Sequence, residues 1–356
     1  MTSKIEFKIS YNFNETLEQE WSYLTKISTV PIFHTYSWQA LWSKNILKNS
    51  LFIINVYSND KIIAIIPFEK KNFLNFKTLS LTGYPFADYC DCIIDKNFFK
   101  INLKFKDYVC KYLMNLQNVD LILFKNICEN SNIHFLLGSS NFKKYPFSSY
   151  QLLKYSTKNE NIISKKFKND TNRQIKRLKQ TGKLLFKIAD NDYDKEKIFK
   201  FFVNHKSKQL VNSNNWNYLN DDCYKIFLHS IFFNYKGHLS YLTLDNKIIA
   251  VHMGNIYNGK LLYLFPTYDN DYRKYSPGNI LLYNLIIFFF NNGGKEFDFT
   301  TGNEPYKIKL SNCKRNMFFK NCGLTFSGKI ISVILLFFNN LKNFNKLKLI
   351  YNKIKY

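Results

Sequence analysis

The segment YRKYSPGNILLYNLI, residues 272 to 286, places a Ser-Pro-Gly step directly before an apolar run of helical character. Proline is tolerated at the first position of a helix, because the N–H that it lacks has no partner there. The remaining free N–H groups and the positive end of the helix dipole favour phosphate. Gly278 would let a ligand approach the main chain, and Arg273 adds a bidentate donor. Plain helix capping accounts for the same pattern, so this segment alone leaves both interpretations open.

A second segment, GGKEFDFTTGNEPYK at residues 293–307, supplies carboxylates, a phenol and an ammonium group. Together the two segments resemble the CelD-type acetyltransferases of the GNAT superfamily, which are related to the FemABX group. Arg273, Ser276 and Gly278 are similar to the superfamily's acyl-CoA pyrophosphate loop, with Ser276 in place of the commoner glycine. The other shared motifs are Asp298-Phe299, Gly302-Asn303-Glu304 and Tyr306-Lys307.

Several earlier segments are also similar to that family. They are WSYL, FHTYSWQALW and GYPFADYCD in the first half, and the basic stretch FKNDTNRQIKRLKQTGKL. The resemblance therefore covers most of the chain. It implies that acyl-CoA, most simply acetyl-CoA, is the co-substrate. We expect no metal, because neither the cysteines nor the histidines have the spacing of metal ligands. The residues implied to bind acyl-CoA are Arg273, Tyr275, Ser276, Pro277, Gly278 and Asn279.

The resemblance further implies that an acceptor amine attacks the thioester directly. Such a reaction needs a base for the amine, a donor for the oxyanion and an acid for the leaving thiolate. Asp298 or Glu304 would serve as base or bind the acceptor, Tyr306 would protonate the sulfur, and Lys307 would anchor an anionic acceptor. Each residue also has a structural explanation, since a carboxylate can cap a loop or helix and a tyrosine can pack.

The acceptor site is expected to include residues from both halves of the chain. His252 lies on a predicted strand and could face the acceptor, although a lone histidine among apolar residues is more often a hydrogen-bonded core residue. In the first half, Trp38, Asp88 and Tyr89 are candidates to line the acceptor site. The first half lacks an R-x-x-G joint before a helix, so we expect it to shape that site rather than to bind CoA.

Length and an internal repeat both indicate two domains. A chain of 356 residues exceeds the size at which one core stops growing. Lys61-Ile62-Ile63-Ala64-Ile65 and Lys247-Ile248-Ile249-Ala250-Val251 match at a constant offset, each after a strand and a polar turn pair.

We expect an α/β fold of tandem GNAT-like domains, each a mixed, mostly antiparallel sheet flanked by helices. The expected parts are an N-terminal half (1–157), an acyltransferase domain (158–330) and a basic amphipathic C-terminal helix (331–356). The pattern of the basic stretch 158–182 predicts a helix, on which Arg173 and Arg177 share a face. A solvated face is the simpler explanation for that pair, with anion binding as the alternative.

The formal charge of +25 attracts polyanions, although abundant Lys, Asn, Ile, Phe and Tyr also result from AT-rich coding. Seven cysteines without a C-x-x-C pair argue against zinc ligation and a disulfide framework. The N-terminus lacks an apolar signal core, and the apolar runs 280–290 and 330–338 are shorter than the ~18 residues needed to span a bilayer. We therefore expect a cytoplasmic protein, with contact to the inner face of the membrane as an alternative for the C-terminal helix.

Three functions remain open at this stage. The leading one is transfer of an acyl group from acyl-CoA to an amine of a small-molecule or glycan acceptor, such as a sugar, polysaccharide or cell-envelope precursor. The second is FemX-like transfer of an amino acid from aminoacyl-tRNA to a peptidoglycan precursor. The third is a non-catalytic tandem domain that binds nucleic acid or a membrane through charge.

Overall fold

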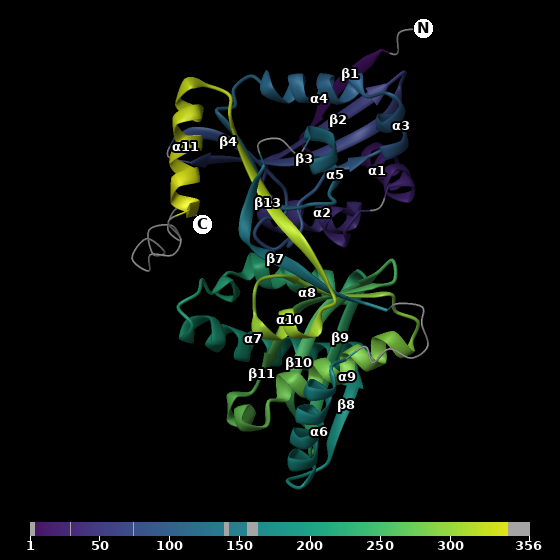
Figure 1. The fold of residues 1–356 in the computed structure, drawn as a ribbon. Helices are drawn as coiled ribbons and strands as arrows, with labels where there is room; N and C mark the ends of the chain where they lie inside the picture. The colour runs from purple at the N-terminus through teal and green to yellow at the C-terminus, as the bar shows by residue number, and fades with distance from the viewer. Residues whose placement is uncertain (1–3, 29, 74, 139–141, 155–162, 341–356) are drawn as a thin grey trace. The chain divides into compact units, whose positions relative to one another are not determined.

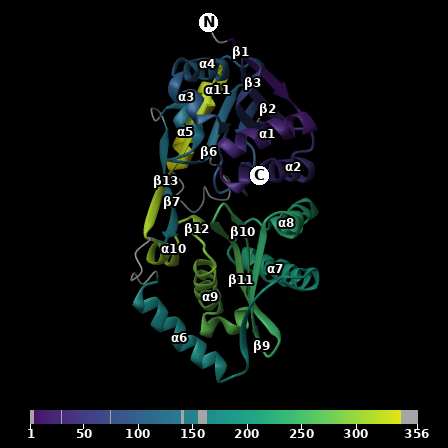
Figure 2. The same ribbon diagram turned by 90° about the vertical axis from the view of Figure 1, so that its right-hand side faces the viewer.

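The computed structural model describes residues 4–28, 30–73, 75–138, 142–154 and 163–340. The chain forms two compact units (Figures 1 and 2): unit 1 comprises residues 1–146 and 316–356, and unit 2 comprises residues 147–315. Two strands carry the chain across the unit boundaries, β7 (Lys143–Leu153) on the way out and β13 (Cys313–Gly323) on the way back.

Unit 1 is a sheet with the strand order β1-β2-β3-β4-β6-β13 among the described residues, and the short strand β5 pairs with β3. Its elements are β1 (Ile5–Ser10), α1 (Glu15–Ile27), η1 (Ile32–His34), α2 (Tyr36–Trp42), η2 (Ser43–Leu47), β2 (Leu51–Ser58), β3 (Lys61–Phe73), β4 (Phe76–Leu81), β5 (Ile93–Ile94), α3 (Lys96–Ile101), α4 (Lys104–Met114), β6 (Leu121–Cys128), α5 (Asn132–Leu137) and α11 (Phe326–Asn340). Asn14 caps α1 by accepting from the Leu17 N–H.

Unit 2 is a sheet with the strand order β8-β9-β10-β11-β12-β7. Its other elements are α6 (Lys165–Lys179), β8 (Leu184–Ile188), α7 (Asp192–Asn212), η3 (Tyr218–Asn220), α8 (Asp222–Asn234), β9 (Gly237–Leu244), β10 (Lys247–Tyr257), β11 (Lys260–Tyr268), η4 (Asn270–Tyr275), α9 (Pro277–Asn291), β12 (Glu296–Thr301) and α10 (Pro305–Leu310). Helices α7 and α8 cover one face of the sheet, while α9 covers the other and α6 packs beside α9 (Figure 2).

The two sheets repeat one plan. In each unit the first four strands are antiparallel, the fourth and fifth strands pair in parallel, and the fifth pairs antiparallel with the sixth. The repeated KIIA segment also carries the same irregularity, because a β-bulge skips Ile63 in unit 1 and Ile249 in unit 2. The expected fold class, two tandem domains with mixed and mostly antiparallel sheets, is confirmed.

In each unit, the sixth strand of the sheet comes from a part of the sequence that adjoins the residues of the other unit. Unit 1 takes its sixth strand, β13, from the C-terminal part of the sequence, and β7, which precedes all other strands of unit 2, completes the sheet of unit 2. The units therefore divide after Pro146 and Arg315, whereas the sequence pattern placed the boundaries at 157 and 330. The C-terminal helix begins at Phe326, and residues 341–356 lie outside the described residues.

Candidate functional site

The start of α9 is held in a fixed position by its own burial. The helix is apolar on nearly every side, and Leu281, Leu285 and Phe289 are among the residues that it buries against the sheet. The preceding turn η4 is capped by Asp269, which accepts from the Asp271 N–H and pairs with Lys247 at 3.2 Å. The strand, the turn and the helix start therefore form a rigid joint.

Ser276 sets the geometry of this joint. Its backbone is left-handed (φ 53°, ψ 51°), and its carbonyl accepts from the N–H groups of both Asn279 and Ile280. Pro277 has no N–H, so within the described chain the Gly278 amide is the one backbone donor of the first turn without an acceptor. The helix start thus presents fewer backbone donors than the sequence suggested, and the Ser276 hydroxyl, which does not cap the helix, adds one.

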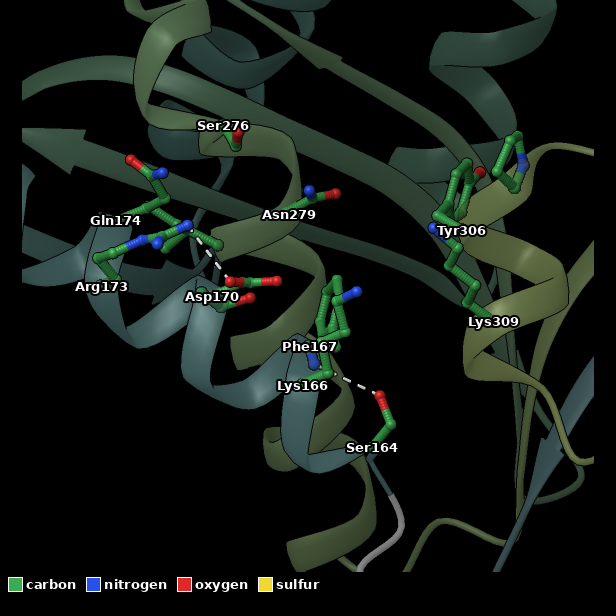
Figure 3. Close-up of a pocket in the computed structure, with 13 residues that line it drawn as sticks. Ser164, Lys166, Phe167, Asp170, Arg173, Gln174, Ser276, Asn279, Tyr306 and Lys309 are labelled. Carbon is green, nitrogen blue, oxygen red and sulfur yellow. Dashed lines mark hydrogen bonds and ion pairs between the residues drawn. The ribbon is translucent and has the colours of Figure 1, made fainter.

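A pocket of about 720 Å³ lies against this helix start, within the range of small-molecule sites. Side chains of α6 and α10 face it from two sides, with Ser276 and Asn279 between them (Figure 3). The lining residues are Ser164, Lys166, Phe167, Asp170, Thr171, Arg173, Gln174, Ser276, Asn279, Ile280, Pro305, Tyr306 and Lys309.

Most of the charged side chains that line the pocket are cationic. Lys166, Arg173 and Lys309 supply three positive charges against the single carboxylate of Asp170, which lies 3.3 Å from the Arg173 guanidinium. Amide and hydroxyl groups of Gln174, Ser276 and Asn279 add neutral hydrogen-bonding groups. This set of donors fits the phosphates of a CoA-like ligand, since both its charge and its donor capacity match a polyanion.

Strands β11 and β12 open beside the pocket. Their parallel pairing covers three residue pairs and ends at Leu262 and Asp298. Beyond that point, the rings of Phe299 and Tyr306 lie near the buried ring of Tyr263, with centroids 6.4 Å from it. Tyr306 belongs both to this aromatic cluster and to the pocket lining, so its phenol stands where the pocket meets the opening between the strands.

Asp298 is buried and holds a local kink in β12. Its Oδ1 accepts from the Thr300 N–H at 2.7 Å and from Gln151 at 3.3 Å, and Thr300 has a positive φ of 62°. This arrangement gives Asp298 a structural task next to the opening.

Glu304 and Lys307 form an ion pair at the start of α10. Their charged atoms are 3.2 Å apart, and the buried Lys307 ammonium also donates to the Thr301 carbonyl oxygen. About half of the Glu304 side chain remains exposed. Of the two carboxylates singled out in the sequence, Glu304 is the accessible one.

Comparison with known proteins identifies this region. Residues 165–308, which include the pocket, the opening and the Glu304–Lys307 pair, match the family described as "Acetyltransferase (GNAT) domain". This segment is therefore similar to GNAT acetyltransferase domains. The resemblance to CelD-type acetyltransferases noted in the sequence is thereby confirmed.

Solved structures agree with the tandem fold of the whole chain. FemX superposes with a TM-score of 0.53 at 10% identity, covering 87% of this chain and 96% of FemX. L-PGS from Bacillus licheniformis superposes with a TM-score of 0.51 at 11% identity, covering 91% of this chain and 95% of L-PGS. The C-terminal domain of a putative lysylphosphatidylglycerol synthetase from Agrobacterium fabrum has a TM-score of 0.52 at 9% identity. The superposition covers 89% of this chain and 94% of that domain. Identities this low relate folds alone, and no curated protein matches the chain in sequence.

Not all residues implied to bind acyl-CoA line the pocket of the GNAT domain. Ser276 and Asn279 do, whereas Pro277 is buried in α9 and Arg273 is exposed on η4. Tyr275 packs on the core near Leu178 and lies beneath the Arg177 guanidinium, 5.3 Å from ring centroid to Cζ. A Cβ added to Gly278 would contact the Tyr268 ring at 3.4 Å, an ordinary van der Waals distance.

His252 lies in the core of the GNAT domain. It is fully buried on β10 and stacks on Tyr263 with ring centroids 4.5 Å apart. Neither ring nitrogen has a hydrogen-bond partner among the described residues. Burial lowers the pKa of His252 well below its usual value, and the nearby His238 adds to that shift, so the ring is neutral.

The three acceptor-site candidates of the first half belong to unit 1. Trp38 and Tyr89 are buried in its core, where the Trp38 ring stacks on Trp42 and both side chains pack beside Phe33. Asp88 is partly exposed. A contact between these side chains and an acceptor stays a prediction.

Several residues of the site were not singled out from the sequence. Lys166, Gln174 and Lys309 face the pocket, and Arg173 was noted only as a member of a basic helix face. Lys206 of α7 is a further example, lying 3.5 Å from the Pro266 carbonyl oxygen on the opening strand β11. Burial lowers the pKa of Lys206 to about 8, against the opposing effect of Glu304. Helical spacing could reveal these basic faces, but not the elements that they face.

The described residues contain neither a metal-binding cluster nor a membrane-spanning helix. No group of His, Cys, Asp and Glu side chains there could hold a metal ion. Nor does any helix in those residues combine the length and the apolar character that crossing a bilayer requires.

Proposed function

We propose that unit 2 transfers an acyl group, most simply acetyl, from acyl-CoA to an acceptor amine. The observation that carries this proposal is the cationic pocket at the start of α9, which opens toward the separated strands β11 and β12 inside a GNAT domain. A GNAT-family acyltransferase needs a polyanion site beside such an opening, so that the thioester reaches the acceptor while the phosphates stay bound.

In this proposal the walls of the pocket share the binding of the CoA moiety. Lys166 and Arg173 of α6 and Lys309 of α10 neutralise its phosphates, while the Ser276 hydroxyl and the Gly278 amide donate from the start of α9. Charge-assisted hydrogen bonds from separate elements fix the ligand against rotation. The thioester end then points along the apolar wall formed by Tyr306 and its aromatic neighbours.

The chemical step divides between Glu304 and Tyr306. The acceptor nitrogen forms a bond to the thioester carbonyl carbon, and the carbon–sulfur bond breaks with its electron pair on sulfur. Glu304 takes the proton that the amine loses, and the Tyr306 hydroxyl gives a proton to the leaving thiolate. Lys307 holds the Glu304 carboxylate in place through their ion pair.

The acceptor we propose is an amine of a sugar, polysaccharide or cell-envelope precursor, which the CelD resemblance supports. The likeness to FemX in fold keeps aminoacyl-tRNA as the alternative donor to test.

Calorimetry tests the choice of donor. We expect the purified chain to bind acetyl-CoA saturably, and mass spectrometry of reactions with an amino-sugar panel to show a mass gain of one acetyl group. Tight binding of charged tRNA without acetyl-CoA binding would support the aminoacyl-tRNA alternative. Steeply salt-dependent binding to any polyanion, with no saturable CoA site, would support a non-catalytic role.

A further inference from the structure

Helix α11 of unit 1 carries its side chains in the reverse of the usual amphipathic order. A surface helix normally buries its large apolar residues and exposes its polar ones. On α11 the large apolar residues Phe326, Ile330, Val333 and Ile334 are exposed, with 81% of Phe326 and 65% of Val333 accessible. Their spacing of i, i+4, i+7 and i+8 places them on one face of the helix.

The buried positions of α11 among the described side chains are small residues, Gly328 and Ser332, while Ile331, Leu335 and Leu336 are partly buried. A Cβ at Gly328 would collide with the carbonyl oxygen of Asp120, so only glycine allows the helix to lie this close to β6. Ser332 is buried, and its hydroxyl donates to the Asn321 carbonyl oxygen at 3.3 Å. Gly328 and Ser332 thus let α11 pack closely against unit 1. The exposed apolar residues then lie on the face of the helix that points away from unit 1.

Lysines accompany this stripe, together with one carboxylate, Asp120, which accepts from the Thr325 hydroxyl next to Phe326. Lys329 lies exposed beside Ile330, and the sequence after α11, residues 341–356, contains five lysines and no acidic residue. The whole chain carries a formal charge of +25. An exposed apolar stripe next to lysines suits the interface of an anionic membrane, where apolar side chains enter the acyl boundary and lysines meet the headgroups.

We propose that the α11 stripe, defined as Phe326, Ile330, Val333 and Ile334, docks unit 1 on an anionic lipid surface. We place the helix along that surface, since its described part, Phe326–Asn340, is too short to cross a bilayer. Docking of this kind would keep an envelope precursor near the enzyme. The proposal stands on α11 alone and does not depend on acyl transfer.

Sedimentation of the full chain with lipid vesicles tests the proposal. We expect binding to vesicles of equal parts phosphatidylcholine and phosphatidylglycerol, no binding to phosphatidylcholine alone, and weaker binding at high salt. The double variant Phe326→Ser with Val333→Ser should bind about tenfold less tightly or weaker, since two exposed apolar anchors are lost. Circular dichroism and acetyl-CoA binding should match the unmodified chain.

A matched control replaces two equally exposed apolar residues elsewhere on unit 1. Ile101 and Leu103 are 82% and 62% exposed, and Ile101→Ser with Leu103→Ser should leave vesicle binding unchanged. The proposal fails if the unmodified chain ignores anionic vesicles, or if both double variants bind alike. A dimer in light scattering that only the stripe variant dissociates, without vesicle binding, would instead assign the stripe to a second copy.

Discussion

Units 1 and 2 build the same sheet and differ in the connection after its fourth strand. In unit 2, the strand β11 passes through one short turn into α9, whose start borders the cationic pocket. In unit 1, the strand β4 leads through a loop, β5 and α3 before α4 begins. The sheet and its bulge are therefore common to both units, whereas the short connection in unit 2 places a helix start at the opening between two strands.

Buried polar side chains without a hydrogen-bond partner occur in both units among the described residues, but one polar group from each unit shows a contrast. In unit 1, the Asp91 carboxylate accepts from three backbone N–H groups, and burial raises the pKa of Asp91 to about 6 against their opposing effect. In unit 2, the buried His252 has no partner among the described residues, and Lys206 has two weak neutral acceptors at 3.3 and 3.5 Å. Under-satisfied polar groups of this kind concentrate at functional sites.

The largest effect that would distinguish the function of unit 2 from that of unit 1 is the loss of turnover expected on substitution of Tyr306. Tyr306→Phe should lower kcat by roughly 10²-fold or more, because it removes the acid for the leaving thiolate, while the Kd for acetyl-CoA stays near its original value. The readout is release of free thiol with the best acceptor from the amino-sugar panel. Tyr283→Phe, a partly buried tyrosine of α9 that does not line the pocket, is the control. Equal turnover of both variants would remove Tyr306 from the mechanism.

The glycines located after the fourth strands should respond in opposite ways. Gly83 of unit 1 has a φ of +96°, and its added Cβ would lie 2.8 Å from Ala87 Cβ and 3.0 Å from the Trp38 ring. Gly83→Ala should therefore destabilise the protein by about 2–3 kcal/mol. Gly278→Ala should leave the stability equal or up to ~1 kcal/mol higher, because it adds a helix-favouring residue with an ordinary contact.

Urea unfolding of the full chain measures both changes. The bulkier Gly278→Val should remove acetyl-CoA binding while the fold remains. A loss of stability at Gly278→Ala as large as that at Gly83→Ala would show that Gly278, like Gly83, is required by the fold rather than by a ligand.

Removing cations from the pocket should weaken donor binding. Arg173→Met with Lys309→Met should raise the Kd for acetyl-CoA about tenfold to thirtyfold at moderate salt, less at high salt, because both side chains are partly solvated. The control is Lys168→Met with Lys176→Met, two exposed lysines of α6 outside the pocket lining. If the control weakens binding equally, general charge rather than the pocket holds the ligand.

The smallest effect is expected for the pH dependence of stability. Burial lowers the pKa of Lys206 from 10.5 to about 8, so between these pH values the unfolded chain binds a proton that the folded chain lacks. Stability from this site therefore rises with pH across that window and is lowest below pH 8. Lys206→Met should be more stable than the unmodified chain near pH 7 by roughly 1–2 kcal/mol, a difference that disappears toward pH 10. Thermal unfolding against pH, with exposed Lys208→Met as control, should show this convergence for Lys206→Met alone.

Local patterns predicted most of the fold but not how its distant parts meet. Alternation, turn pairs and the KIIA repeat indicated the hairpins, because each depends on neighbours in sequence. The pocket wall from α6 could not be predicted, since helical spacing shows that Lys166, Arg173 and Gln174 lie on a helix but not that the helix docks beside α9. The exchange of β7 and β13 could not be predicted for a related reason. The sequence of a strand does not determine which strand more than a hundred residues away it pairs with.

The exchanged strands have a consequence for how the chain folds as it is synthesised. All residues of unit 2 are contiguous, so its sheet can close once Arg315 has emerged. Unit 1, although its synthesis starts first, waits for β13 to cover the open edge of β6. The domain made first is finished last, and until then its unpaired edge strand is open to pairing with other chains.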